Sequence, residues 1–351
     1  MRGKGGIIEA MLTRLNLRFA ALGKNGTDAF FKRRKRSQSP FSVALCILCL
    51  GPLALMAASK IKPAPAKPPA AATRPATAPA STSPAATQAA QYPLPELVAQ
   101  CRQAAKEMAA RLDNSFECIV EPPFVVFGNY PQGDVRRSVD SCVIQPARAM
   151  WSGYFQAKPD HPITVLLFND DKSYRDWAKK LFDDEDVSHF GYYKPDARTM
   201  VMNISTGGGT LIHELTHALI AYDFPDVPQW FNEALGSLHE GCQVGADEIV
   251  GLPNWRLAAL QEAIKKGSLR PLRQTVTLDD FYGDLRGLNY AQGRYFAMYM
   301  QHEGLLKKFY AAYRRDHDGA ESAVKAIEAA FGKKIDAVDK AFIEYVKTLK
   351  Y

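Results

Sequence analysis

Uninterrupted apolar runs mark the short strands of this chain. Residues 124–127 and 163–168 are such runs, and each is flanked by polar or turn-forming residues. Short continuous apolar runs of this kind are typical of buried strands. Residues 189–193 and 199–204, joined by a turn rich in Pro and Asp, have the pattern of a hairpin. The sequence therefore predicts a small sheet in the first half of the domain.

Helical spacing of apolar residues surrounds these strands. It occurs over residues 97–112 and 139–155, and again after residue 168, where Asn169 or Asp170 can cap a helix. From residue 211 onward nearly the whole chain has a helical pattern. A small sheet with helices, followed by a mainly helical half, is an α+β layout. We therefore predict a single α+β domain over residues 96–351.

The net charge of +7 is concentrated at the amino terminus. Residues 1–40 hold ten Lys or Arg and two Asp or Glu, which leaves 34 basic and 35 acidic residues in the rest of the chain. A nearly neutral remainder argues against a general nucleic-acid-binding surface, so we expect no nucleic acid among the partners. We assign residues 1–40 as a basic cytoplasmic tail.

Residues 41–59 form an uncharged and mostly apolar run of 19 residues. This length lies at the boundary between a signal-peptide core and a transmembrane anchor. The preceding basic residues stay in the cytoplasm by the positive-inside rule, and the rest of the chain crosses the membrane. We expect a single-pass protein of the cell membrane with an extracytoplasmic C-terminal domain, or a secreted or periplasmic protein if cleavage occurs near Ser59.

Residues 60–95 contain nine prolines and many Ala, Ser and Thr residues. This composition predicts an extended linker between the membrane segment and the domain. The exported part then contains four cysteines, an even number that is compatible with two disulfides in an oxidising compartment. The sequence does not select among the three pairings of Cys101, Cys118, Cys142 and Cys242.

The candidate chemistry lies in residues 210–219, which contain the pattern H-E-x-x-H. On a helix, His213 and His217 share one face, so both imidazoles can reach one cation. Zinc suits two imidazoles and a carboxylate with one position open for water, and Glu214 would be the general base for that water. The glycines at residues 207–209 precede the helix, and Thr210 is its expected N-cap.

A third zinc ligand is expected from the next helix, which begins near Pro228. Glu233 follows His217 by 16 residues, and a turn between two antiparallel helices would bring it back to the histidine pair. His239 and Glu240 on the same helix are competing candidates, but they lie nearly two turns further along. We favour Glu233 as the ligand.

These residues carry a family resemblance. HELTH followed by WFNEALG resembles the gluzincin metallopeptidases, the group of aminopeptidase N, in which a helix with WLNEG supplies the glutamate ligand. Leu288 to Gly293 is similar to the Y-x-x-G segment of that group. The resemblance implies that Tyr290 donates a hydrogen bond to the oxyanion of the tetrahedral intermediate. Tyr295 is the second candidate, and helix packing would explain either tyrosine without a catalytic role.

The closer likeness is to the exported or membrane-anchored bacterial proteins called peptidase MA-like, and it covers roughly residues 95–350. It implies a zincin-like metallopeptidase domain with bound zinc and a peptide or protein substrate. The chain departs from the aminopeptidases at two places. No G-x-M-E-N segment precedes the zinc helix, and Ser237 stands where some zincins have an acidic residue that orients a histidine. The sequence does not indicate which groups orient His213 and His217.

The sequence thus predicts a zinc-dependent peptidase or amide hydrolase of the cell envelope. The strand at residues 200–204 precedes the zinc helix, and we expect it to be an edge strand along which an extended peptide can pair. The alternative is a catalytically inactive, exported peptide-binding or scaffold module that retains the zincin fold. The presence of Glu214 together with Tyr290 favours the enzyme, because neither residue is needed to hold zinc.

Overall fold

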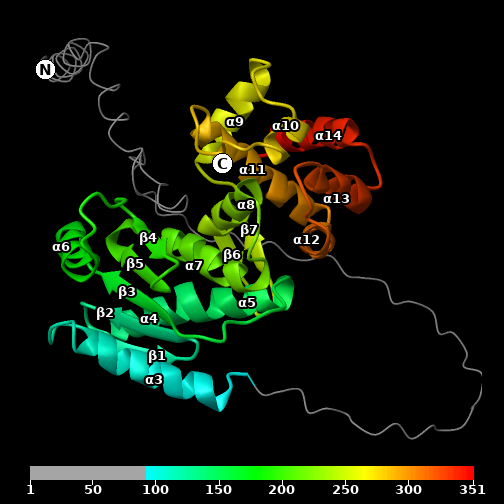
Figure 1. Cartoon of the computed structure of the whole chain (residues 1–351). Coiled ribbons are helices and arrows are strands. Elements are labelled where there is room, and N and C mark those ends of the chain that lie inside the picture. Colours follow the sequence, from blue (N-terminus) through cyan, green and yellow to red (C-terminus); the bar gives the residue numbers. More distant parts are fainter. Residues whose placement is uncertain (1–91) are drawn as a thin grey trace, which may run out of the picture. The chain divides into compact units, whose positions relative to one another are not determined.

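The computed structural model describes residues 92–351 (Figure 1). The predicted cytoplasmic tail, the apolar segment at residues 41–59 and nearly all of the linker lie outside the described residues. None of the helices within residues 92–351 is long and apolar enough to span a membrane. The described part is a mixed α/β structure, mainly helical with a small sheet, which agrees with the predicted α+β layout.

The larger sheet has five strands in the order β1-β2-β3-β5-β4. Strands β2, β3 and β5 are parallel, whereas β1 and β4 are antiparallel to their neighbours at the two edges. The central strands form where the apolar runs predicted them, because both of their faces are buried. The bounds are β1 Glu117–Glu121, β2 Phe124–Gly128, β3 Ile163–Phe168, β4 Gly191–Lys194 and β5 Thr199–Asn203.

Helices cover both faces of this sheet. Helices α3 (Pro95–Ala109) and α6 (Asp171–Phe182) pack on one face, where Phe127, Phe168 and Val201 are buried. Helix α4 (Gln132–Val139), α5 (Gln145–Gly153) and α7 (Gly208–Asp223) pack on the other face, in a core that continues into the helical half. Helix α7, which carries the H-E-x-x-H pattern, therefore lies directly against the sheet.

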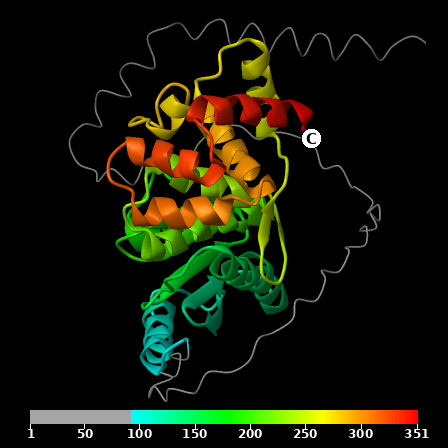
Figure 2. The same cartoon turned by 90° about the vertical axis from the view of Figure 1, so that its right-hand side faces the viewer.

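The helical half is built around α8 (Gln229–Glu240), which packs against both α7 and α11 (Arg286–His302). Figure 2 shows α9 to α14 gathered on the side of α8 away from the sheet. A short hairpin follows α8. Its strands and the remaining helices are β6 Cys242–Val244, β7 Ile249–Gly251, α9 Arg256–Lys265, α10 Leu272–Val276, α12 Leu306–Arg315, α13 Glu321–Phe331 and α14 Ile335–Thr348.

Three local predictions need correction. The predicted helix at residues 139–155 is the end of a longer one that begins at Gln132 and passes through a π-helical segment, η1 (Asp140–Ile144). In this segment the backbone N–H of Gln145 bonds to the carbonyl of Asp140. Pro146 follows immediately and has no N–H to give to the carbonyl four residues earlier, so regular α-helical bonding cannot continue there.

The start of α7 also differs from the prediction. Thr210 is not the N-cap, because α7 begins at Gly208 with Gly207 at the N-cap position. Gly207 has a φ of 105°, which a residue with a side chain rarely adopts. The start of the helix also packs tightly, since a Cβ at Gly209 would lie too close to the backbone carbonyl oxygen of Glu240. Glycine thus allows the helix to begin three residues earlier than predicted.

The expected edge strand is an interior strand. β5 pairs with β3 on one side and with β4 on the other, because the hairpin places β4 on its outer side. The edge of the sheet next to α7 is therefore β4. The four cysteines that could have formed two disulfides, Cys101, Cys118, Cys142 and Cys242, are all free thiols. Cys101 is a buried residue of α3, whereas Cys118 is exposed on β1.

Candidate metal centre

Two adjacent helices bring the predicted metal ligands together. His213, His217 and Glu233 each offer a ligand atom, and these atoms lie within 4.8 Å of one another. Oε2 of Glu233 is 3.4 Å from Nε2 of His213 and 3.6 Å from Nε2 of His217. Among the described residues, no hydrogen-bond donor contacts this buried Oε2 atom. Three ligand atoms thus converge on one point, as the sequence predicted.

Close packing of α8 on α7 makes this convergence possible. Gly236 lies one turn after Glu233 and faces the two imidazoles. A Cβ at this position would lie 3.0 Å from Nε2 of His213 and 3.0 Å from Cε1 of His217. A side chain here would meet the atoms that face the metal position. The absence of a side chain at Gly236 therefore lets the two helices approach closely at the centre.

The other nitrogen of each histidine faces an acceptor on α8. Nδ1 of His217 lies 2.8 Å from Oδ1 of Asn232, and Nδ1 of His213 lies 3.7 Å from Oε2 of Glu240. Glu240 is in turn bound by Nη2 of Arg256 at 3.1 Å. An acceptor beside each Nδ1 favours the tautomer with its proton on that atom, and this tautomer leaves both Nε2 atoms for a metal. Glu240 thus lies on the Nδ1 side of His213, outside the group of three converging ligand atoms.

The remaining competing candidate, His239, points away from the cluster. Its two ring nitrogens contact the hydroxyls of Tyr154 and Thr216, and Thr216 Oγ1 lies 2.9 Å from His239 Nδ1. Burial lowers the pKa of His239 to about 3, and the positive charge of Arg294 adds to this effect. His239 is therefore a neutral core residue. Ser237 is fully buried and does not contact either metal-facing histidine through a hydrogen bond.

Glu214 lies beside the cluster, next to the edge strand. Its side chain is 8% exposed, and burial raises its pKa. The two imidazoles oppose this rise, as does a hydrogen bond from the backbone of Tyr193 in β4. A buried carboxylate with a raised pKa is a better proton acceptor near neutral pH than an exposed one. The geometry therefore brings the candidate base, the histidine pair and the free edge of β4 to one place.

Two tyrosines approach the outer side of Glu233. The hydroxyl of Tyr282 donates to Glu233 Oε1 at 2.6 Å. Tyr290 on α11 is 3% exposed, and burial raises its pKa well above the usual value, with a further contribution from Glu233. Tyr290 thus lies close to Glu233. The second candidate, Tyr295, instead exchanges hydrogen bonds with the backbone of Asn254 and is a structural residue.

The charges of the cluster stabilise one another. Burial opposes ionisation of Glu233, but the two imidazoles outweigh it and hold its pKa well below the usual range. Burial likewise opposes protonation of His213, but Glu233 and Glu240 raise its pKa to about 10. Before a metal binds, the cluster thus stores a proton that a cation would displace. Such a buried group of two bases and a carboxylate is chemically suited to Zn²⁺.

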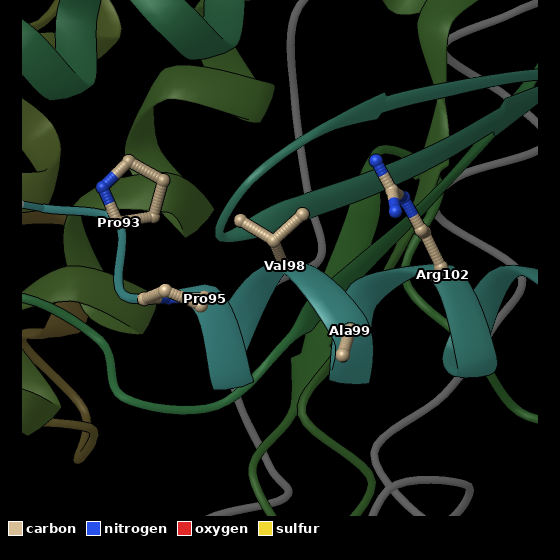
Figure 3. A pocket seen from close by; sticks show the side chains of 5 residues that line it. All are labelled: Pro93, Pro95, Val98, Ala99 and Arg102. Carbon is tan, nitrogen blue, oxygen red and sulfur yellow. The ribbon is translucent and has the colours of Figure 1, made fainter.

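Sequence reasoning missed Asn232, Glu240 as an orienting group, Tyr282 and Arg256. Asn232 precedes the ligand Glu233 directly, and its position could have suggested its role. Tyr282 and Arg256 lie in segments far along the chain, and nothing local marks them. A shallow pocket of about 370 Å³ at the start of α3, lined by Pro93, Pro95, Val98, Ala99 and Arg102 (Figure 3), contains none of the cluster residues.

Comparison of the chain with known protein families and with curated proteins finds no match.

Proposed function

We propose that this protein is a zinc-dependent peptidase or amide hydrolase with a zincin-like domain at residues 96–351. The observation that carries the proposal is the buried cluster of His213, His217 and Glu233. Its metal-facing atoms converge, and the Oε2 atom of Glu233 has no hydrogen-bond donor. The resemblance of HELTH and WFNEALG to the gluzincin peptidases supports the same conclusion.

The cluster residues have separate tasks in this proposal. His213, His217 and Glu233 hold the metal, which would supply a Lewis acid for a water molecule and for a substrate carbonyl. Glu214 accepts a proton from the attacking water and passes a proton to the leaving amine. The Tyr290 hydroxyl donates a hydrogen bond to the oxyanion of the tetrahedral intermediate. Asn232 and Glu240 keep the imidazoles in the tautomer that binds metal.

The free edge of β4 is the proposed binding position for the peptide backbone. β4 is the outermost strand next to α7, and the backbone of Tyr193 in β4 hydrogen-bonds to the candidate base Glu214. An extended peptide that pairs with this edge would therefore run past the base. A complex with a substrate analogue that shows no main-chain pairing with β4 would remove this part of the proposal.

The deciding experiment compares the wild-type chain with Glu214→Gln and Glu233→Ala. We expect one bound zinc in wild type and in Glu214→Gln, and much less in Glu233→Ala, by mass spectrometry of the metal content. Hydrolysis of a broad peptide library should occur only with wild type. Zinc binding without any hydrolysis by wild type would favour the second candidate, an inactive peptide-binding module.

A further inference from the structure

The two carboxylate oxygens of Glu233 have different surroundings. Oε2 lies 3.4 Å from Nε2 of His213 and 3.6 Å from Nε2 of His217, and no hydrogen-bond donor of the described residues contacts it. Oε1 instead accepts a hydrogen bond from the Tyr282 hydroxyl at 2.6 Å. Glu233 is buried, so neither oxygen is freely solvated. One oxygen thus faces the histidine pair, and a phenol holds the other.

Buried contacts anchor the segment between α10 and α11 that carries Tyr282. Phe281 is fully buried, and its ring centre lies 5.2 Å from that of Tyr290. Nδ2 of Asn289 donates a hydrogen bond to the Phe281 carbonyl at 2.8 Å. Nη1 of Arg270 donates in turn to Oδ1 of Asn289 at 3.0 Å. The backbone next to Tyr282 is therefore fixed, and its hydroxyl is in place before any metal binds.

The hydrogen bond to Oε1 bears on how Glu233 would bind a metal. A carboxylate can bind a cation through one oxygen or through both. With one oxygen from Glu233, the three protein ligands fill three of the four tetrahedral positions that zinc prefers, and the fourth stays open. A catalytic zinc site needs this open position for water or substrate. A second oxygen from Glu233 would compete for it.

We propose that Tyr282 is a positioning residue that makes Glu233 a ligand through Oε2 alone and so keeps a metal position open. This inference rests on the proposed function for the presence of the metal. Tyr282 acts through Glu233, whereas Tyr290 donates to the oxyanion in the proposed function. Without the Tyr282 hydroxyl, Oε1 loses its donor inside a buried site and turns to the metal as a second ligand oxygen.

The test reads the coordination of the bound metal and does not depend on turnover. The full chain and its Tyr282→Phe variant are loaded with Co²⁺, whose visible absorption is stronger in four-coordinate sites than in sites with more ligands. We expect Tyr282→Phe to lose absorption per bound Co²⁺. It should also bind zinc about tenfold more weakly in competition with a chelator, as expected when a group that holds a ligand is removed.

Tyr222→Phe is the matched control. The buried hydroxyl of Tyr222 on α7 has no hydrogen-bond partner within the described part of the chain. Its removal should change neither the absorption per bound Co²⁺ nor the zinc affinity. A variant that is only less stable would bind less Co²⁺, but the absorption of each bound ion would stay the same. The spectrum therefore separates a positioning role from a structural one.

The wild-type chain tests the inference even if Tyr282→Phe does not fold. A crystal structure with zinc should show Oε2 of Glu233 about 2.0–2.2 Å from the metal, with Oε1 still bonded to Tyr282. Both oxygens at that distance in wild type, or an unchanged Co²⁺ spectrum in Tyr282→Phe, would overturn the inference and leave the proposed hydrolase standing. A wild-type chain that binds neither ion would overturn the inference and the proposed function together.

Discussion

Glu240 shows how one side chain can replace another in orienting a metal ligand. Ser237 stands where some zincins have an acid, yet His213 still faces a carboxylate, because Glu240 reaches it from one turn further along α8. Arg256 fixes this carboxylate, and the pKa of Glu240 falls to about 2 because His213 and Arg256 outweigh the effect of burial. Glu240 therefore stays ionised behind His213 over the whole physiological range.

We expect Glu240→Gln to weaken zinc binding by about 10- to 100-fold, the usual effect of removing a group that orients a histidine ligand. The loss would reflect a weaker hold on Nδ1 of His213. Competition with a zinc chelator measures the dissociation constant. Glu262→Gln on the exposed face of α9 is the matched control. An unchanged dissociation constant in Glu240→Gln would show that His213 is oriented by other means.

His239 makes the stability of the fold depend on pH. Its folded pKa is about 3, whereas a free histidine titrates near pH 6.5, so between these values the unfolded chain binds a proton that the folded chain does not. This histidine therefore contributes less stability as the pH falls below about 6.5. We expect the free energy of unfolding of wild type, relative to His239→Gln, to decrease by about 2 kcal/mol between pH 7 and pH 5.

Urea unfolding at both pH values measures this difference. The comparison with His239→Gln removes the titrations that both proteins share, including those of the metal-facing histidines. A difference between the two proteins that stays constant from pH 7 to pH 5 would mean that His239 becomes protonated within the fold.

The site residues that the sequence predicted lie within short, recognisable sequence motifs. His213, Glu214 and His217 lie within one helical turn, and Glu233 has a recognisable context, so all four could be found without a structure. Tyr282 and Arg256 could not, because the chain returns to the cluster from segments whose positions depend on the packing of α9 and α11. The orienting groups of a site are therefore harder to predict than its ligands.

At the scale of elements, the contact between α7 and α8 is the feature that builds the site. We expect Gly236→Ala to weaken zinc binding by at least tenfold, because a 3.0 Å approach to both imidazoles forces the helices apart or turns the rings. Gly287→Ala is the matched control, since a Cβ on that glycine of α11 meets no atom within 4 Å. It should bind zinc normally and gain stability by about 0.5 kcal/mol.

Zinc titration and thermal unfolding of the two alanine variants decide this prediction. Normal zinc affinity in Gly236→Ala would show that α8 can shift without disturbing the ligands. A loss in both variants would point to a general effect of alanine, and the specific role of Gly236 would then be wrong.

The helices and strands were predicted best where one apolar pattern extends over the whole element. Strand β3 has the predicted bounds. Of the two predicted caps of α6, Asn169 and Asp170, it is Asp170 that accepts a hydrogen bond from the backbone N–H of Ser173. The sequence also predicted the hairpin of β4 and β5. It did not predict that β4 is the edge strand, because a pattern of apolar residues does not show which strand of a hairpin lies at the edge of the sheet. The sequence did not predict β6 and β7, because an apolar pattern over three residues is too short to distinguish a strand from the neighbouring helices.

At the scale of the whole described chain, a buried carboxylate connects the sheet part to the helical part. Asp223 is the last residue of α7 and is 2% exposed. Its Oδ1 accepts from the backbone N–H groups of Gln156 and Ala157 at 2.8 and 2.5 Å, after α5. Its Oδ2 accepts from the Tyr310 hydroxyl on α12 at 2.6 Å. One side chain thus joins three segments that are far apart in the sequence.

We expect Asp223→Ala to lower the free energy of unfolding by about 3 kcal/mol, because it leaves two partly buried backbone donors and a buried phenol without their acceptor. Tyr310→Phe removes only one of these bonds and should cost about 1 kcal/mol. Urea unfolding measures both, and zinc content should stay at the wild-type value, since neither residue contacts the cluster. If Asp223→Ala costs no more than Tyr310→Phe, water must satisfy the backbone groups near Gln156, and Asp223 would then connect the two parts only through its bond to Tyr310.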